Sequence, residues 1–238
     1  MRDIDVRRVS SAFLTDMRFQ WKQGFFVIYL IVSFFYLLIL SQLPHFIIDY
    51  ALPIIVFSDP SVLGLFFIGG MVLLEKEQGV LQMLVVTPLT VKEYVLSKVI
   101  SLTLVALMAG ILITAVSAYN PVDYFTLIIG IILTSVFFTL LGFIISTKAK
   151  SLNSFFLHMM PWTALLMVPC VFYVIYPQLT ALLIVPSVTG LNLVLGAIGG
   201  QPLSEIILTS FYLVVVNYFL FQKSCSIFQK KMVYGGSV

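Results

Sequence analysis

Long apolar runs, separated by short polar segments, make up most of this chain. A helix rises about 1.5 Å per residue, so roughly 20 apolar residues cross the ~30 Å hydrocarbon core of a bilayer. The pattern predicts six such spans. They lie at about residues 25–43, in a second run that ends near Leu74, at 99–118, in a fourth run that ends near Ser146, at 155–176 and at 204–221.

The start of the second span is the least defined part of this pattern. The chain there is apolar but interrupted by prolines and polar residues, namely Pro44, His45, Asp49, Pro53, Asp59 and Pro60. Such a segment is either an outer loop or the tilted start of the second span.

Residues 1–24 form a separate amphipathic segment. Apolar side chains recur at three- and four-residue steps on one helical face, at Val6, Val9, Phe13, Met17 and Trp21. Basic residues occupy much of the remaining surface, at Arg2, Arg7, Arg8, Arg18 and Lys22. We expect such a helix to lie in the plane of the membrane interface, because it joins directly to a span. The alternative is a partly ordered soluble tail.

The apolar stretch at residues 177–203 differs from the six spans. It is interrupted at Pro177, Pro186, Gly190, Gly196, Gly199, Gly200 and Pro202. It suits short helices at the outer surface or a re-entrant hairpin buried against protein, since irregular backbone in a membrane must be shielded from lipid.

Composition supports the same class. Hydrophobic residues are 61% and charged residues 10% of the 238, whereas a soluble domain has about 25% charged residues. We therefore expect an all-α polytopic membrane protein with six transmembrane helices. Its parts are an N-terminal amphipathic interfacial helix at 1–24 and a six-span domain at 25–238. That domain contains a re-entrant or outer broken helix segment, 177–203, before the last span.

The placement of charge predicts an orientation. Six spans put both termini on one side of the membrane, and that side then carries all 13 Lys and Arg residues. The other side receives only His45, Asp49, Asp59, Asp123 and Glu205. By the positive-inside rule, both termini face the cytoplasm, in a cell (inner) membrane.

Several kinds of chemistry find no support in the sequence. We expect no charge near the middle of any span, which disfavours an ion-coupled carrier or a voltage sensor. Neither an intramembrane protease motif nor a Gly-x-x-x-x-Gly-Lys-Ser/Thr phosphate loop occurs. We therefore expect no catalytic residue, no metal site and no cofactor on this chain. The pattern does not single out substrate-binding residues.

Residues 75–98 are the longest polar interruption in the first half of the chain. Their middle, residues 80–86, is apolar and must lie in the membrane interface or dock on another surface. Thr90 and Glu93 have the spacing of a capping box at the start of the next helix. The segment is therefore expected to form a short elbow, which we call the coupling elbow.

The coupling elbow resembles the corresponding motif of ABC type-2 (ABC-2) transporter permeases, in their short six-span bacterial form. The residues that carry the resemblance are Glu75, Glu77, Gly79, Leu81, Leu84, Thr87, Pro88, Leu89, Glu93, Tyr94 and Lys98. The chain departs from the family pattern at Gln78, Val80 and Gln82, where glutamate, threonine and glutamate are common.

The resemblance implies a transport subunit and not an enzyme. Such permeases form homodimers or pair with a related permease, and they associate with two cytosolic ATP-binding subunits, which carry the ATP and Mg. They move substrates outward, and the apolar spans here favour an amphiphilic or hydrophobic substrate. The resemblance places contacts with the ATP-binding subunit at Glu75, Glu77, Gly79, Thr87, Pro88, Glu93 and Lys98.

A second interpretation stays open from the residues alone. The chain would be a membrane scaffold or a small channel subunit that ATP does not drive, and residues 75–98 would be only an interfacial loop. An intramembrane enzyme is disfavoured, because the spans lack paired polar groups at membrane depth. The expected partners are the lipid bilayer and other proteins, with no nucleic acid.

Overall fold

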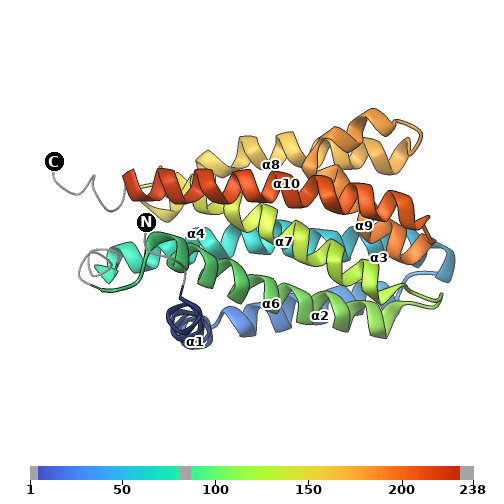
Figure 1. Ribbon diagram of the computed structural model, residues 1–238. Coiled ribbons are helices and arrows are strands. Elements are labelled where there is room, and N and C mark those ends of the chain that lie inside the picture. The colour runs from blue at the N-terminus through green and yellow to red at the C-terminus, as the bar shows by residue number, and fades with distance from the viewer. Residues whose placement is uncertain (1–4, 81–86, 231–238) are drawn as a thin grey trace.

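In the computed structural model, which describes residues 5–80 and 87–230, every regular element of these residues is a helix (Figure 1). Most helices run lengthwise through one bundle, and α1 lies across one end. In chain order the elements are α1 (Val6–Lys22), α2 (Phe25–Ser41), α3 (His45–Ser58), η1 (Asp59–Leu63), α4 (Gly64–Glu77), α6 (Val91–Ser117), α7 (Tyr124–Ser146), α8 (Leu152–Ile175), η2 (Thr180–Ile184), α9 (Pro186–Gly199) and α10 (Leu203–Phe228).

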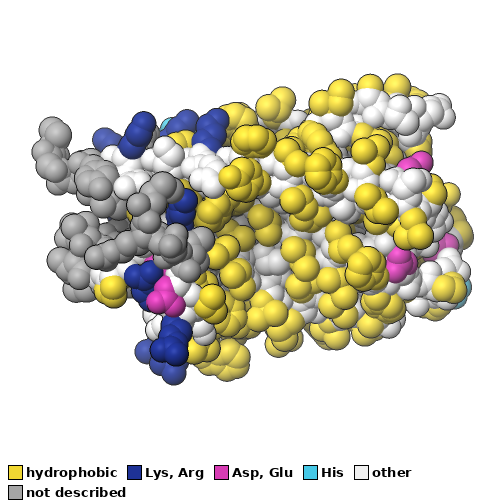
Figure 2. Space-filling model, in the orientation of Figure 1, with side chains coloured by type: hydrophobic (Ala, Val, Ile, Leu, Met, Phe, Trp, Pro, Cys, Tyr) yellow, Lys and Arg dark blue, Asp and Glu magenta, His cyan; other side chains and the backbone are white. Residues whose placement is uncertain are grey.

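Four of these helices, α6, α7, α8 and α10, are each long and apolar enough to cross a membrane. Helices α1 and α2 add a fifth candidate if they are counted as one broken span, bent by 65°. Figure 2 shows a broad apolar surface between the two ends of the bundle. The chain is thus a helical membrane protein, with four or five candidate spans by length and composition among the described residues.

Helix α1 leaves the bundle because the backbone turns at Gly24. This residue has φ +77°, a left-handed conformation that glycine adopts without a steric penalty. Asp5 caps the other end of α1, where its side chain accepts a hydrogen bond of 2.9 Å from the Arg7 N–H. Within the segment predicted at residues 1–24, the described part from Val6 to Lys22 is therefore a helix with Asp5 as its cap.

Polar side chains of α1 face the protein, and several of its apolar side chains are exposed. The side that packs on α6 buries Asp16 and Gln20, and Gln20 donates a 2.8 Å hydrogen bond to the Ser101 hydroxyl. Val6 and Trp21 are instead 79% and 73% exposed. α1 thus attaches to the protein through polar groups and directs apolar side chains outward, as suits a helix at a membrane interface.

Helices α3, η1 and α4 form one continuous helical path over residues 45–77. The path continues through Pro53, and Pro60 stands within the first two residues of η1, a π-helical segment. A proline lacks the N–H that an α-helix requires, and a π turn rearranges the local hydrogen bonds. Asp59 therefore lies within a helical segment in the interior of the bundle and not in a loop between two helices.

Helix α7 is the centre of the bundle and packs against α4, α6, α9 and α10. Its close approach to α4 depends on Gly142, where an added Cβ would lie 2.6 Å from Ile68 Cγ2. On the α9 side, a Cβ added at Gly190 would lie 2.4 Å from Thr134 Oγ1. Glycines at these contacts let the backbones approach more closely than larger side chains allow.

The stretch at residues 177–203 consists of the 3₁₀ helix η2 and the short helix α9. Most side chains of α9 are buried, against α3, α7, α8 and α10. Asn192 accepts hydrogen bonds of 2.8 Å from both the Tyr173 hydroxyl and the Gln201 amide. The Ala197 carbonyl accepts a third, of 2.8 Å, from the Asp123 N–H. α9 is therefore a buried helix of the bundle.

The described Lys and Arg residues gather at one end of the bundle, which we call the basic end (Figure 2). This end carries α1, the last turn of α4, the first turns of α6, the α7–α8 connection and the last turns of α10. The opposite end carries the acidic residues Asp49, Asp123 and Glu205.

Candidate functional site

A buried ion cluster joins three helices at the basic end. The Lys98 ammonium group on α6 lies 2.9 Å from the Asp16 carboxylate on α1 and 2.6 Å from the Glu75 carboxylate on α4. Glu75 also accepts a 2.5 Å hydrogen bond from the Tyr94 hydroxyl, and Asp16 accepts one of 2.7 Å from Ser97 Oγ. Two carboxylates thus share one lysine, and each has a second donor.

Burial decides the role of this ion cluster. The Lys98 side chain is completely buried, and Asp16 and Glu75 are each 6% exposed. Removal of an ion from water costs several kcal/mol, and the ion pairs and hydrogen bonds of the cluster offset that cost. Loss of one member leaves another charge buried without its partner, which costs about 3–5 kcal/mol. The cluster therefore fixes α1 against α4 and α6.

A second polar cluster surrounds Glu93 at the start of α6. Its carboxylate accepts hydrogen bonds from the Asp5 N–H at 2.8 Å and the Thr90 N–H at 2.7 Å, and it lies 3.0 Å from the Arg8 guanidinium group. Thr90 Oγ1 accepts from the Glu93 N–H at 3.3 Å, which confirms the predicted capping box. Arg8 also donates to the Pro88 carbonyl at 3.1 Å. α1 is therefore tied to the residues before α6 as well.

Three of the seven residues expected to contact an ATP-binding subunit take part in these internal clusters. Glu75, Glu93 and Lys98 are buried, and each has its polar partners within the chain. Their place in the structure is beneath the surface of the basic end. Any contribution to a partner contact is therefore made through the position of α1 and of the elbow.

The other four residues lie at the surface or shape the turn. Glu77, Thr87 and Pro88 are exposed. Gly79 follows α4 with φ +73°, a backbone conformation that favours glycine at the end of a helix. Residues 81–86, the apolar part of the elbow, lie outside the described residues. Glu77 is thus the acidic residue of the motif that faces outward.

A groove of about 420 Å³ lies beside these residues at the basic end. Its lining includes members of both polar clusters together with exposed residues of the elbow: Arg8, Asp16, Glu75, Thr87, Pro88 and Tyr94. The groove therefore presents a concave, partly polar surface that the buried charges hold in shape.

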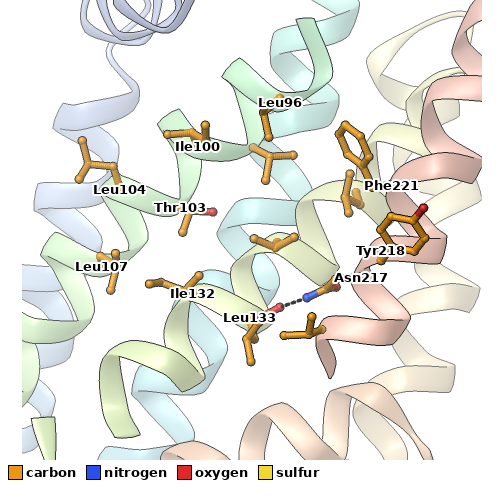
Figure 3. Close-up of a pocket in the computed structure, with 14 residues that line it drawn as sticks. Leu96, Ile100, Thr103, Leu104, Leu107, Ile132, Leu133, Asn217, Tyr218 and Phe221 are labelled. Atoms are coloured by element: carbon orange, nitrogen blue, oxygen red, sulfur yellow. Dashed lines mark hydrogen bonds between the residues drawn. The ribbon is translucent and has the colours of Figure 1, made fainter. Parts of the chain in front are cut away.

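An apolar groove of about 460 Å³ lies farther along the bundle, between α6, α7 and α10 (Figure 3). Leu104, Ile132 and Phe221 are among the side chains around it. Asn217 Nδ2 donates a 2.9 Å hydrogen bond to the Leu133 carbonyl, which leaves Asn217 Oδ1 as an acceptor without a partner. Mostly apolar walls with few polar groups are typical of small-molecule sites.

A third feature is a carboxyl group in the interior of the bundle. Asp59 is the first residue of η1 and is completely buried, and neither of its carboxyl oxygens has a hydrogen-bond partner. η1 packs against α6 and α7 as well as against its neighbours α3 and α4. An unpaired carboxyl group away from water is costly, so its presence in the bundle interior is a reason to search for a function.

Sequence reasoning missed Asp16 and Asp59. For Asp16 a signal was present, since Asp16 and Gln20 are four residues apart and so share one side of a helix. For Asp59 the adjacent Pro60 favoured a loop. The sequence alone does not show which group either residue faces. The partner of Asp16, for example, is 82 residues away along the chain.

The fold defines a multi-pass helical membrane protein, and its apolar grooves suit the handling of apolar or amphiphilic molecules. Residues 7–235 match the model of the fluoroquinolones export permease protein family, and the chain belongs to that family. Two relatives named fluoroquinolones export permease protein come from Mycobacterium tuberculosis, strains CDC 1551 / Oshkosh and ATCC 25618 / H37Rv. Each is 27% identical over 167 residues, which cover 70% of this chain and 70% of the relative. The chain is thus a membrane transport protein of an export permease family.

Proposed function

We propose that this chain is the membrane subunit of an ATP-driven exporter that moves amphiphilic drugs, including fluoroquinolones, out of the cytoplasm. The observation that carries the proposal is the match of an export permease family over residues 7–235, almost the whole chain. The names of the two relatives supply the drug class. The resemblance of residues 75–98 to ABC-2 permeases supplies the ATP dependence.

In this proposal the chain crosses the membrane six times. The spans are α2, the continuous path α3–η1–α4, α6, α7, α8 and α10. Helix α9 is a re-entrant element before the last span. The basic end faces the cytoplasm, as the positive-inside rule requires, so both termini lie there.

The coupling surface is the exposed part of the basic end. Two ATP-binding subunits contact a dimer of permeases there, at Glu77, Thr87 and Pro88 and in the adjacent groove. The ion cluster of Lys98 and the contacts of Glu93 make α1, α4 and α6 respond together when that surface moves. ATP-driven movement of the subunits then shifts the balance between two arrangements of the spans.

Transport into inverted membrane vesicles tests the proposal. The chain is expressed together with its candidate ATP-binding subunit, and accumulation of norfloxacin, a fluoroquinolone, is measured with ATP and with a non-hydrolysable analogue. We expect accumulation with ATP alone, and its loss when the Walker lysine of the partner is replaced by alanine. Equal accumulation under all three conditions would show that ATP does not drive this chain, and would favour the scaffold or channel interpretation.

A further inference from the structure

The starting observation is a pair of polar side chains in the apolar groove between α6, α7 and α10. Thr103 on α6 and Asn217 on α10 both line this groove of about 460 Å³ (Figure 3). The two residues are only 7% and 6% exposed. In the part of the chain that the structure describes, neither the Thr103 hydroxyl nor Asn217 Oδ1 has a hydrogen-bond partner. Walls that are otherwise mostly apolar therefore contain two polar atoms whose bonding capacity is not used.

Thr103 differs from two other hydroxyl residues of its own helix. Ser101 Oγ donates a 3.0 Å hydrogen bond to the Lys98 carbonyl, and Thr114 Oγ1 donates one of 2.8 Å to the Gly110 carbonyl. Such a bond to the preceding turn is the usual way in which a helix satisfies a serine or threonine. In Figure 3 the Thr103 oxygen instead points from α6 toward the side of α7. This hydroxyl group is therefore available to a molecule in the groove.

Asn217 uses only one end of its amide group. Nδ2 donates a 2.9 Å hydrogen bond to the Leu133 carbonyl on α7, which fixes the orientation of the amide. Oδ1 can only accept a hydrogen bond, so it requires an N–H or O–H group from elsewhere. A buried acceptor without a partner costs about 1–3 kcal/mol. A bound molecule with a donor at this place recovers that cost.

The groove lies at the side of the bundle, toward the basic end. Its rim includes Ile100, Val214 and Tyr218, which are 42%, 51% and 60% exposed. On α6, which begins at the basic end, the lining residues lie between 96 and 107, and on α10, which ends there, between 214 and 221. In the proposed orientation the groove therefore opens toward lipid in the cytoplasmic half of the membrane.

We propose that this groove binds the exported drug and takes it up from the cytoplasmic leaflet of the membrane. The apolar ring system of the drug packs on the walls, an N–H group of the drug donates to Asn217 Oδ1, and the Thr103 hydroxyl bonds a second polar group. A volume of about 460 Å³ falls within the range of drug sites. A lipid acyl chain fits the apolar walls but leaves both polar atoms unpaired, so the chemistry of the groove favours an amphiphilic molecule.

This inference rests on the proposed function, because it assigns a binding site to the exported drug. It adds two requirements that the family name does not contain. The drug carries a hydrogen-bond donor next to an apolar body, and it reaches the protein through the membrane and not through a water-filled channel.

Equilibrium binding of norfloxacin to the full-length chain in lipid nanodiscs tests the site without any ATP-binding subunit. Binding to empty nanodiscs is subtracted, since the drug also partitions into lipid. Thr103→Val keeps the shape of the side chain and removes a hydroxyl group that has no partner in the described chain, so the variant should fold like the wild type. It should weaken norfloxacin binding about three- to tenfold, the value of one hydrogen bond.

A second probe tests the role of Asn217. N-acetylnorfloxacin has the same ring system, but acetylation removes the amine N–H groups. We expect the wild-type chain to bind norfloxacin about fivefold more tightly than this probe. Asn217→Leu should abolish the preference, whereas Thr103→Val should retain it. Both probes meet the same bilayer in every variant, so their partition into lipid cancels when variants are compared.

Matched controls separate recognition from folding. Thr114→Val makes the same chemical change on the same helix, at a hydroxyl group that already bonds the Gly110 carbonyl and does not line the groove. It should keep wild-type affinity for norfloxacin. Leu104→Trp fills the groove at a side chain that is 38% exposed, and it should weaken both probes equally.

Four results would each overturn the site. They are no binding of norfloxacin above empty nanodiscs, wild-type affinity in Thr103→Val, wild-type affinity in Leu104→Trp, and a preference that survives in Asn217→Leu. Thr103→Val keeps the site testable even if Asn217→Leu does not fold. None of these results depends on ATP, so they are distinct from a failure of the vesicle experiment. An exporter that is not driven by ATP would still show the binding preference, and an ATP-driven exporter that uses another site would not.

Discussion

Two buried acidic sites of this chain have opposite surroundings. At the basic end, Asp16 and Glu75 share the Lys98 ammonium group, and each accepts a further hydrogen bond. In the bundle interior, Asp59 has neither an ion pair nor a hydrogen bond. A buried charge that has its ion pairs and hydrogen bonds fixes the position of the helices that carry it. A buried charge without such partners lowers the stability of the fold. The comparison therefore separates an ion cluster that stabilises the fold from a carboxyl group that lowers its stability.

The largest effect is expected for Lys98→Met, because it leaves Asp16 and Glu75 buried without their cation. The chain should lose about 3–5 kcal/mol of stability, measured by thermal or denaturant unfolding in detergent. Lys92→Met is the control, on the same helix at a partly exposed residue, and it should leave the transition almost unchanged. Equal effects of the two substitutions would contradict a structural role for the ion cluster.

Glu93→Gln should have a smaller effect. The amide keeps the shape of the side chain but weakens the contacts with Arg8 and with the N–H groups of Asp5 and Thr90. Since charge-assisted hydrogen bonds contribute about 1.5–3 kcal/mol, we expect a loss at the lower end of that range. Proteolysis at α1 should accelerate in step with the change in unfolding, and an unchanged cleavage rate would show that Glu93 does not hold α1.

Asp59→Asn should change stability least among the buried sites, by less than about 1 kcal/mol, and a gain is the expected direction. The substitution removes a group that has no partner to lose. Unfolding of the chain without ligand measures this directly. A loss as large as that of Lys98→Met would mean that Asp59 has a structural partner, and the contrast between the two sites would disappear.

Glu77→Lys should leave the unfolding temperature unchanged, because Glu77 is exposed. If the proposed function holds, its effect should appear as reduced stimulation of ATP hydrolysis when the chain is reconstituted with the proposed ATP-binding subunit. Glu75→Lys changes the buried acidic residue of the same segment for comparison. It should destabilise the fold, so that any loss of ATPase stimulation would accompany unfolding. If Glu77→Lys retained full stimulation, this residue would not be part of the coupling surface.

The sequence predicted the helical class and several local features well, because these depend on short-range pattern. The capping box of Thr90 and Glu93 is confirmed, and the amphipathic segment near the N-terminus is present as α1. Local spacing determines both, so a single stretch of sequence contains the information.

The sequence could not predict the pairing of distant charges or the location of Asp59. Asp16 and Lys98 are paired only because α1 folds back across α6. Prolines near Asp59 predict a break in the helix, but the tertiary contacts of η1 with α6 and α7 keep the helical path continuous. Long-range packing decided both outcomes, and hydrophobic periodicity does not report it.

The attachment of α1 has a mechanical consequence. The helix is covalently joined to α2 through Gly24, and it is held to α6 through Lys98 and Ser101. α1 therefore has two attachment points, one on α2 and one on α6. These two helices form the walls of a groove of about 490 Å³, which Tyr29 also lines. A rotation of α1 at the basic end would therefore change the distance between α2 and α6, and with it the width of the groove between them.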